Sequence, residues 1–206
     1  MTSSHRSYSK DQIYIYENYE GGGGPGGQHC YTAGLLYHHL LTGSESSKLA
    51  VFQLCDWISH VYESSGTLFD LLVAIKNRNR IDLKNILTGK YPFDRGTGYY
   101  MNALLDKYYL TNENKLVRQV NFIIRNTVHP TDDISARNLD NVEITWFYTI
   151  FFQSVCRFLQ AKEELTELDD DFYYARDTLL HYADWMEKNE CPYLEKPEIL
   201  EYPNQT

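Results

Sequence analysis

The sequence predicts an all-α fold of about three helical hairpins, and three observations support this. The stretch Gly34–Gly43 (GLLYHHLLTG) is echoed 69 residues later by Ala103–Asn112 (ALLDKYYLTN), and each copy ends at a Thr-Gly or Thr-Asn corner. A second helical stretch follows each corner. Apart from a short stretch at Ile13–Tyr16, no segment alternates apolar and polar residues as a strand would. Repeated hairpins cannot bury their apolar faces alone, so we expect them to stack on their neighbours.

The first hairpin follows an irregular segment. Residues 1–27 end in a glycine-rich run, which we interpret as a shaped loop that enters the first helix. That helix is expected from Gln28 to Leu41, with Gly43 as its C-cap. The return helix, Glu45–Tyr62, carries apolar residues spaced for one broad face.

The second hairpin repeats this plan after a linking segment. One or two short helices are expected in that segment, at Thr67–Lys76 and Ile81–Leu87. A second entry loop, Tyr91–Gly98, combines prolines, glycines and charges. It leads into a helix at Tyr99–Leu110, and the return helix is expected at Glu113–Asn126.

The third hairpin begins after a polar, irregular segment at Thr131–Val142. Its first helix is expected at Glu143–Ala161. Three acidic residues, Asp169–Asp171, precede the last helix, Phe172–Lys188, where they suit the positive end of the helix dipole. The chain therefore divides into an irregular entry segment, an α-hairpin domain and a C-terminal tail: residues 1–27, 28–190 and 191–206.

Composition excludes some classes of partner. The formal net charge is −9, from 28 acidic and 19 basic residues. This charge disfavours nucleic acid, which is bound mainly through Lys and Arg on phosphates, and it disfavours an anionic membrane surface. No apolar run approaches the ~20 residues that span a bilayer. The N-terminus lacks the apolar region of a signal peptide, so we expect a cytoplasmic location if Met1 is the true start.

The residue types also bear on small ligands. Tyrosine accounts for 18 residues, and its flat face and hydroxyl suit sugar rings as well as helix contacts near the surface. The four cysteines show no C-x-x-C spacing, and there is no nucleotide-binding, zinc-protease or serine-nucleophile motif. We therefore expect no metal and no cofactor. Cys30 and Cys55 lie on the two arms of the first hairpin, as buried thiols or, alternatively, as a pair.

One stretch resembles a known family. The segment from Gln28 to Gly43, with its Leu-Leu-Tyr and Leu-Leu-Thr-Gly motifs and an Asp56-Trp57 return helix, resembles the hairpin unit of α/α-toroid carbohydrate-active enzymes. These are six-hairpin glycoside hydrolases and polysaccharide lyases, including exo-rhamnogalacturonan-lyase-like proteins. The resemblance covers about residues 28–190. It implies a ring of helical hairpins, with the substrate cleft at the N-terminal ends of the inner helices.

The resemblance also implies that the chain holds part of a toroid. About three hairpins are present where the family closes a ring with six. A row of three leaves an apolar face at each end. We therefore expect either that further hairpins complete the ring or that two copies of the chain pair as a homodimer.

The candidate site follows from the direction of the helices. If the first helices of the three hairpins form an inner ring, their N-termini point the same way. Their entry segments, Gly21–His29, Phe93–Tyr99 and His129–Glu143, then gather on one rim. Helix N-termini and glycine-rich backbone favour the close approach of anionic groups.

The rim offers groups for two reactions. Hydrolysis of a glycosidic bond needs two carboxylates, for which Asp94 and Glu143 are the expected pair. A lyase needs a cation on the uronate, for which Arg95 is suited, and a base from His29, Tyr31 or Tyr99. The expected catalytic residues are Asp94, Glu143, His29 and Tyr99. The expected substrate-binding residues are Gln28, Tyr31, Arg95, His129 and Trp146. Structural roles compete with these: His29 in packing, and Asp94 as the cap of the next helix.

The function expected from these residues is binding or cleavage of an oligosaccharide, with uronic acid as one possible unit. The pattern leaves hydrolase and lyase both open. The main alternatives are a helical-repeat scaffold that binds proteins and a non-catalytic remnant of a toroid enzyme.

Overall fold

The computed structural model describes residues 29–63, 91–139, 146–190 and 195. Within these ranges the chain forms six α-helices, one short 3₁₀ helix and no strand: α2 (Ala33–Thr42), α3 (Glu45–Glu63), α6 (Arg95–Thr111), α7 (Asn114–Arg125), η2 (Ile134–Arg137), α9 (Tyr148–Glu164) and α10 (Asp170–Asn189). The prediction of an all-α fold is confirmed for this part of the chain. The helices expected at Thr67–Lys76 and Ile81–Leu87, the glycine-rich run and most of the tail lie outside the described residues.

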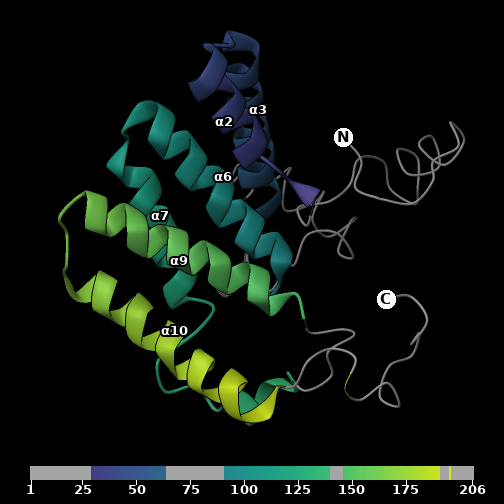
Figure 1. The fold of residues 1–206 in the computed structure, drawn as a ribbon, viewed down its shortest axis with the longest axis vertical. Coiled ribbons are helices and arrows are strands. Elements are labelled where there is room, and N and C mark those ends of the chain that lie inside the picture. The colour runs from purple at the N-terminus through teal and green to yellow at the C-terminus, as the bar shows by residue number, and fades with distance from the viewer. Residues whose placement is uncertain (1–28, 64–90, 140–145, 191–194, 196–206) are drawn as a thin grey trace, which may run out of the picture.

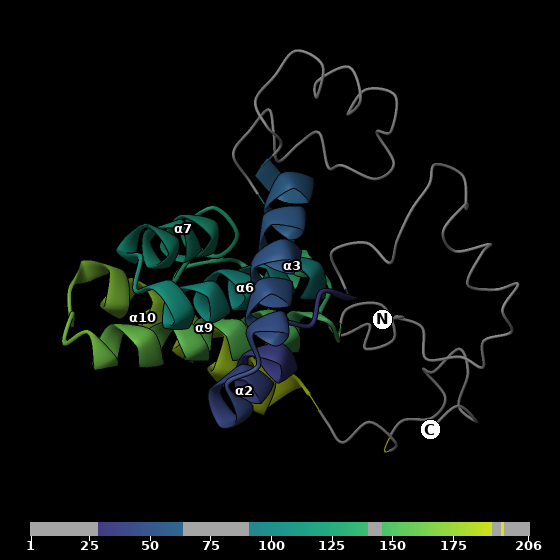
Figure 2. The same ribbon diagram turned by 90° about the horizontal axis from the view of Figure 1, so that it is seen from above.

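The six helices form three hairpins in a row. Helix α2 packs on α3, α6 on α7 and α9 on α10, and the row is joined mainly through contacts of α6 with α9 and α3. Figure 1 shows the pair α2–α3 at one end of the row and α10 at the other. Helices α7 and α10 contact each other and lie together at the end of the molecule away from α3 (Figure 2).

The repeated corners match at the level of single hydrogen bonds. Gly43 has φ of 71° and Asn112 has φ of 56°, both left-handed, and their backbone N–H groups donate to His39 and Tyr108, each at 2.7 Å. The threonine before each corner also bonds back to the carbonyl four residues earlier. Glycine and asparagine tolerate this conformation better than other residues. The repeated sequence motif therefore forms the same corner geometry in the first and second hairpins.

Two aspartates cap the starts of α-helices in the described chain. Asp94 accepts a hydrogen bond from the Thr97 N–H at 2.9 Å, and Asp169 accepts one from the Phe172 N–H at 3.1 Å. The cap at Asp94 starts α6 at Arg95, four residues before the expected start at Tyr99. Asp94 therefore has the structural role that was the alternative to catalysis, and the glycines after it are helical.

Helix α2 starts later than expected, at Ala33 instead of Gln28. Helix α9 is described from Tyr148, and residues 140–145, where its expected start falls, lie outside the described chain. The last helix, Asp170–Asn189, closely matches its expected position.

The first helices of the second and third hairpins run parallel. Near the start of both helices, the Ser154 hydroxyl donates to the Gly98 carbonyl at 2.8 Å. Further along both helices, Arg157 donates to Asn102 at 2.9 Å and to Asp106 at 2.5 Å. Sequence numbers increase together along both helices, so their N-termini lie at the same end.

The segment entering α2 follows the same direction. His29 lies against Arg95, Tyr31 against Tyr99, and Thr32 against Asp106, so these contacts advance along α6 as the segment advances toward α2. His29 and Tyr31 therefore lie near the N-terminal end of α6, whereas Thr32 lies further along this helix. The described residues do not show the ring of a toroid.

The core is apolar and aromatic and centres on α6. Large side chains that are fully buried include Tyr100, Met101, Leu105, Ile123, Tyr148, Phe151, Phe158 and Tyr182. Each such burial contributes about 1.5–3 kcal/mol relative to exposure. Cys30 and Cys55 are buried free thiols, and burial raises the pKa of Cys30 to about 12 and that of Cys55 to about 11. Among the described helices, none combines the length and the apolar character needed to span a membrane.

Candidate functional site

Six side chains from α6 and from the residues just before α2 and α9 form one cluster at the N-terminal end of α6. We call His29, Tyr31, Arg95, Tyr99, Trp146 and Phe147 the rim cluster. The Arg95 guanidinium lies over Phe147 at 4.6 Å from the ring centroid and over Trp146 at 5.8 Å. Tyr31 and Tyr99 meet edge to face, with 4.9 Å between their centroids. A cation therefore lies among aromatic rings that come from three different parts of the chain.

His29 connects the two halves of the rim cluster. Its Nε2 lies 3.4 Å from an Arg95 nitrogen, and its Nδ1 lies 3.2 Å from the Tyr31 hydroxyl. A guanidinium only donates, so Nε2 accepts and the proton of the neutral ring is on Nδ1, which donates to Tyr31. His29 itself is buried. It therefore orients Arg95 and Tyr31, in agreement with the packing role considered for it.

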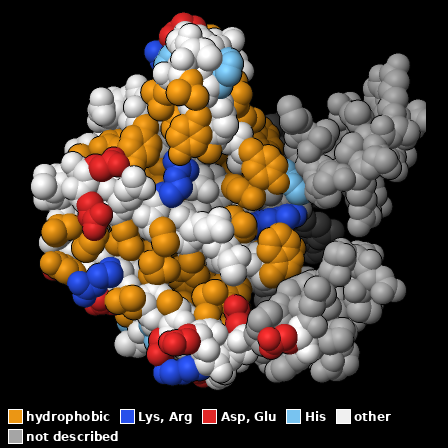
Figure 3. Space-filling model, viewed as in Figure 1, with side chains coloured by type: hydrophobic (Ala, Val, Ile, Leu, Met, Phe, Trp, Pro, Cys, Tyr) orange, Lys and Arg blue, Asp and Glu red, His pale blue; other side chains and the backbone are white. Residues whose placement is uncertain are grey.

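The rim cluster is open to solvent at its aromatic edges. Tyr31 is 49% exposed and Trp146 is 41% exposed, although both are large and largely apolar. Figure 3 shows a basic side chain between groups of hydrophobic side chains, next to a histidine, at the right of the described surface. Exposed rings around an arginine can stack on a flat ligand while the guanidinium binds an acidic group.

Tyr99 is held in its neutral form. Burial, together with the Tyr31 hydroxyl, raises the pKa of Tyr99, and the charge on Arg95 offsets this only in part. A neutral phenol donates a hydrogen bond more readily than it removes a proton from carbon. In this structure Tyr99 thus suits ligand binding better than the role of general base.

Four of the predicted site residues are not part of the cluster as described: Gln28, Asp94, His129 and Glu143. Gln28 and Glu143 lie outside the described residues, so the distance between the predicted catalytic carboxylates of Asp94 and Glu143 is not described. Asp94 precedes Arg95 directly, but its carboxylate caps α6.

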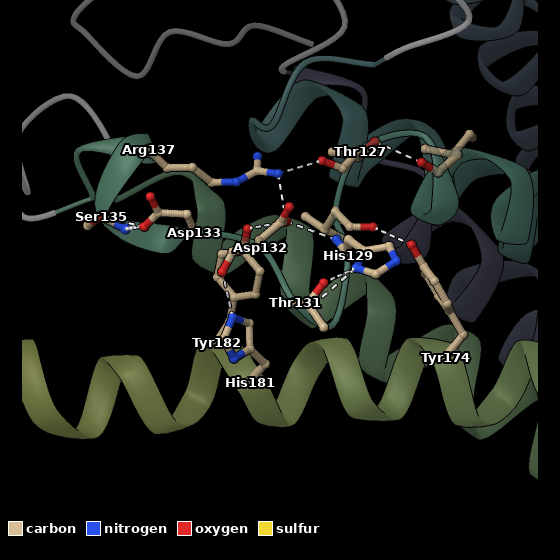
Figure 4. A network of polar contacts seen from close by, with 12 residues as sticks. Thr127, His129, Thr131, Asp132, Asp133, Ser135, Arg137, Tyr174, His181 and Tyr182 are labelled. Atoms are coloured by element: carbon tan, nitrogen blue, oxygen red, sulfur yellow. Dashed lines mark hydrogen bonds and ion pairs between the residues drawn. The ribbon is translucent and has the colours of Figure 1, made fainter.

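His129 belongs to a second network, which joins the segment around η2 to α10 (Figure 4). Its Nδ1 accepts from the Thr131 N–H at 3.1 Å, and its ring meets Tyr174 edge to face at 5.5 Å. Its own N–H donates to Asp132 at 2.9 Å. Asp132 also accepts from Arg137 and from the Tyr182 hydroxyl, each at 2.7 Å.

A buried polar network around Asp106, which was not predicted from the sequence, lies next to the segment that carries His29 and Tyr31. The Asp106 carboxylate is 0% exposed and accepts from Thr32 at 2.6 Å and from Arg157 at 2.5 Å. Thr32 directly follows Tyr31, so this carboxylate fixes the segment that carries two members of the cluster. One signal was available: Asp106 is a charged residue that directly follows the apolar run Ala103-Leu104-Leu105.

A second missed feature is a carboxyl group close to the start of α9. The Tyr148 hydroxyl donates to Glu190, and burial raises the pKa of Glu190 above its ordinary value. Tyr148 directly follows Phe147 of the rim cluster. A raised pKa shifts a carboxyl toward the protonated form, which is the form a general acid requires. Nothing in the sequence around Glu190 pointed to this.

In the described part of the chain, no group of three or more His, Cys, Asp or Glu side chains is placed to hold a metal ion. Comparisons with protein-family models, with curated proteins and with solved structures found no match to this chain. The case for function therefore depends on the geometry of the rim cluster.

Proposed function

We propose that the rim cluster binds an oligosaccharide that contains a uronic acid unit, and that the domain acts on such a chain. The observation that carries this proposal is the position of the Arg95 guanidinium among solvent-exposed aromatic rings. Arginine binds a carboxylate through two parallel hydrogen bonds. Tyr31 and Trp146 offer the flat apolar faces on which sugar rings stack.

The architecture supports the same proposal. The first helices of the second and third hairpins run parallel, and the segment entering α2 follows them, so the cluster lies where the N-termini gather. Helix N-termini favour anionic ligands. We infer that the three hairpins form part of an α/α toroid whose cleft opens at this rim.

The reaction remains a choice between hydrolysis and elimination. For hydrolysis, Glu190 is a carboxyl with a raised pKa that accepts a hydrogen bond from Tyr148, the residue after Phe147 of the rim cluster, and Glu143 is the expected partner. For elimination, Arg95 would neutralise the uronate, and Tyr99 would donate a hydrogen bond to it. Hydrolysis is favoured by the position of Glu190 next to Tyr148 together with the raised pKa of its carboxyl, because a general acid donates a proton to the leaving oxygen.

Isothermal titration with tetragalacturonate and with other uronate-containing oligosaccharides tests the binding step. We expect Arg95→Ala to weaken binding of the acidic oligosaccharides at least about tenfold, because a charge-assisted pair contributes roughly 1.5–3 kcal/mol. Arg118→Ala removes an arginine that is exposed on α7 and is the matched control. It should bind like the wild type.

Two outcomes would contradict the proposal. Equal binding of acidic oligosaccharides by Arg95→Ala and wild type would exclude Arg95 as the carboxylate ligand. An absence of binding across a broad panel of acidic and neutral glycans would exclude the oligosaccharide function altogether.

One observation favours a second function, that of a protein-binding scaffold. Helix α2 exposes Tyr37, Leu40 and Leu41, and Leu41 is 85% exposed. An exposed apolar helix face is a common site of protein association. If the glycan panel gives no binding, this face is the next surface to test.

A further inference from the structure

A second hollow lies between the segment around η2 and the C-terminal half of α10. Its volume is about 320 Å³, which is near the lower end of the range for small-molecule sites. It is lined by Asp132, Asp133, Ile134, Ser135, His181, Asp184, Trp185, Lys188 and Asn189. Figure 4 shows the part of its wall formed by Asp133, Ser135 and His181.

The walls of this hollow are joined by hydrogen bonds. The Asp132 carboxylate accepts from Tyr182 of α10 at 2.7 Å and from Arg137 at 2.7 Å. The Asp132 carbonyl lies 2.8 Å from His181 Nε2. Because a carbonyl only accepts, Nε2 carries the proton. These hydrogen bonds join the segment around η2 to α10 at the wall of the hollow.

The lining combines a flat apolar wall with short polar groups. Trp185 packs against the hydrophobic core and also faces the hollow. Around it stand Ser135, Asn189, and the carboxylates of Asp133 and Asp184. An aromatic face with hydroxyl, amide and carboxylate partners suits the ring and hydroxyls of a sugar.

The negative charge of the lining favours a neutral sugar over a uronate. Lys188 lines the hollow, but it forms an ion pair with Asp184 at 2.6 Å. Asp133 adds a further negative charge at the wall. A uronate in this hollow would meet like charges, whereas a neutral sugar would find hydrogen-bond acceptors.

The hollow is connected to the rim cluster through Phe93. This residue lies two positions before Arg95, and its ring contacts Tyr182 at 5.5 Å between centroids. The Arg137 guanidinium lies 4.9 Å from the same ring. Tyr182 and Arg137 both bind Asp132 at the wall of the hollow. Packed side chains therefore link the wall of the hollow to the residues just before Arg95 of the rim cluster.

We propose that this hollow binds a neutral sugar unit of the same oligosaccharide whose acidic unit binds at the rim cluster. The inference rests on the proposed function. It adds that the oligosaccharide contains both acidic and neutral units. The rim cluster binds the acidic unit, and the hollow binds the neutral unit.

Titration calorimetry with two sets of probes tests the inference. One set combines a uronate with neutral units, such as aldotetraouronic acid, and the other is tetragalacturonate, in which every unit is acidic. We expect Trp185→Leu to weaken binding of the mixed probes about tenfold and to leave tetragalacturonate unchanged. Trp57→Leu, on the exposed side of α3, is the matched control and should change neither.

A second variant tests the hollow independently, in case Trp185→Leu does not fold. Ser135→Tyr adds bulk to the hollow from an exposed position, and it should give the same selective loss. Equal affinity of both variants and wild type for the mixed probes would overturn the inference. If Arg95→Ala still weakened binding in that case, the rim function would stand without the hollow. If neither probe set bound to wild type, both proposals would fall.

Discussion

Asp132 shows how one carboxylate can organise a loop. Burial by itself raises the pKa of Asp132. Hydrogen bonds from Tyr182 and the His129 N–H, and the charge of Arg137, outweigh burial and hold the pKa below its ordinary value. The ionised form is therefore the one that the folded protein prefers. It fixes the segment that carries both His129 and the wall of the hollow.

This preference predicts a pH-dependent stability. A carboxyl whose pKa is lowered on folding stabilises the protein above its unfolded pKa, near pH 4. That contribution is lost as the pH falls through the lower, folded pKa. We expect Asp132→Asn to reduce the free energy of unfolding at pH 7 by on the order of 1–2 kcal/mol, and the difference from wild type to shrink below pH 4.

Urea unfolding at pH 7, 4 and 3 measures this difference. Asp177→Asn is a matched control, because Asp177 forms an exposed ion pair with its neighbour Arg176 at 2.7 Å. Exposed pairs contribute little, so this variant should lose less than Asp132→Asn at pH 7. A difference between Asp132→Asn and wild type that stays constant over this range would contradict the assignment.

The parallel packing of α6 on α9 depends on a single glycine. An added Cβ at Gly98 would lie 3.0 Å from the Ile150 carbonyl oxygen and 3.0 Å from the Phe151 Cα, both backbone atoms. Backbone cannot move aside as a side chain can. The two helices therefore approach closely at their N-terminal ends, immediately below the rim cluster.

Two helical glycines, Gly98 and Gly34, give a matched pair of substitutions. Gly98→Ala should lower the free energy of unfolding by about 1–3 kcal/mol, because overpacking forces α6 and α9 apart. Gly34→Ala lies in α2, where an added Cβ meets no atom within 4 Å. It should be neutral or stabilise by up to about 1 kcal/mol through helix propensity.

Chemical denaturation of both variants checks this prediction. If Gly98→Ala were as stable as Gly34→Ala, the close approach of α6 and α9 would be wrong. We also expect Gly98→Ala to weaken acidic-oligosaccharide binding, since Arg95 and Phe147 lie at the ends of the displaced helices.

The molecule as a whole is a row with an apolar face at its first hairpin. Helix α2 buries Leu36 but exposes Tyr37, Leu40 and Leu41. The middle hairpin, by contrast, is covered by neighbours on both sides. An uncovered apolar face favours association with another surface.

This face predicts concentration-dependent association. We expect light scattering to show dimers or larger species of the chain, and the double substitution Leu40→Lys with Leu41→Lys to shift the population toward monomer. Leu168→Lys, at an exposed leucine beyond the corner of the third hairpin, is the control. A wild-type monomer at all accessible concentrations would contradict the prediction.

Part of the site was predictable from the sequence. The echo of Gly34–Gly43 in Ala103–Asn112 predicted parallel first helices, and that direction led to His29, Tyr31, Arg95, Tyr99 and Trp146 as neighbours, which the contacts bring together. Asp106 and Glu190 were not predicted. The hydrogen-bond partners of Asp106 are 51 and 74 positions away, and that of Glu190 is 42 positions away. Local sequence patterns do not predict contacts over such separations.

The sequence by itself determined that this part of the chain is helical and where the first two corners lie, because these depend on residues within a few positions of one another. Left-handed corners need residues such as Gly43 and Asn112, and a helix start needs a cap such as Asp94. Only the tertiary structure decided that Arg95 lies among rings from three segments and that Asp106 is buried with its partners. Those arrangements arise from packing between hairpins, where distant side chains share one space and burial sets the cost of every unpaired charge.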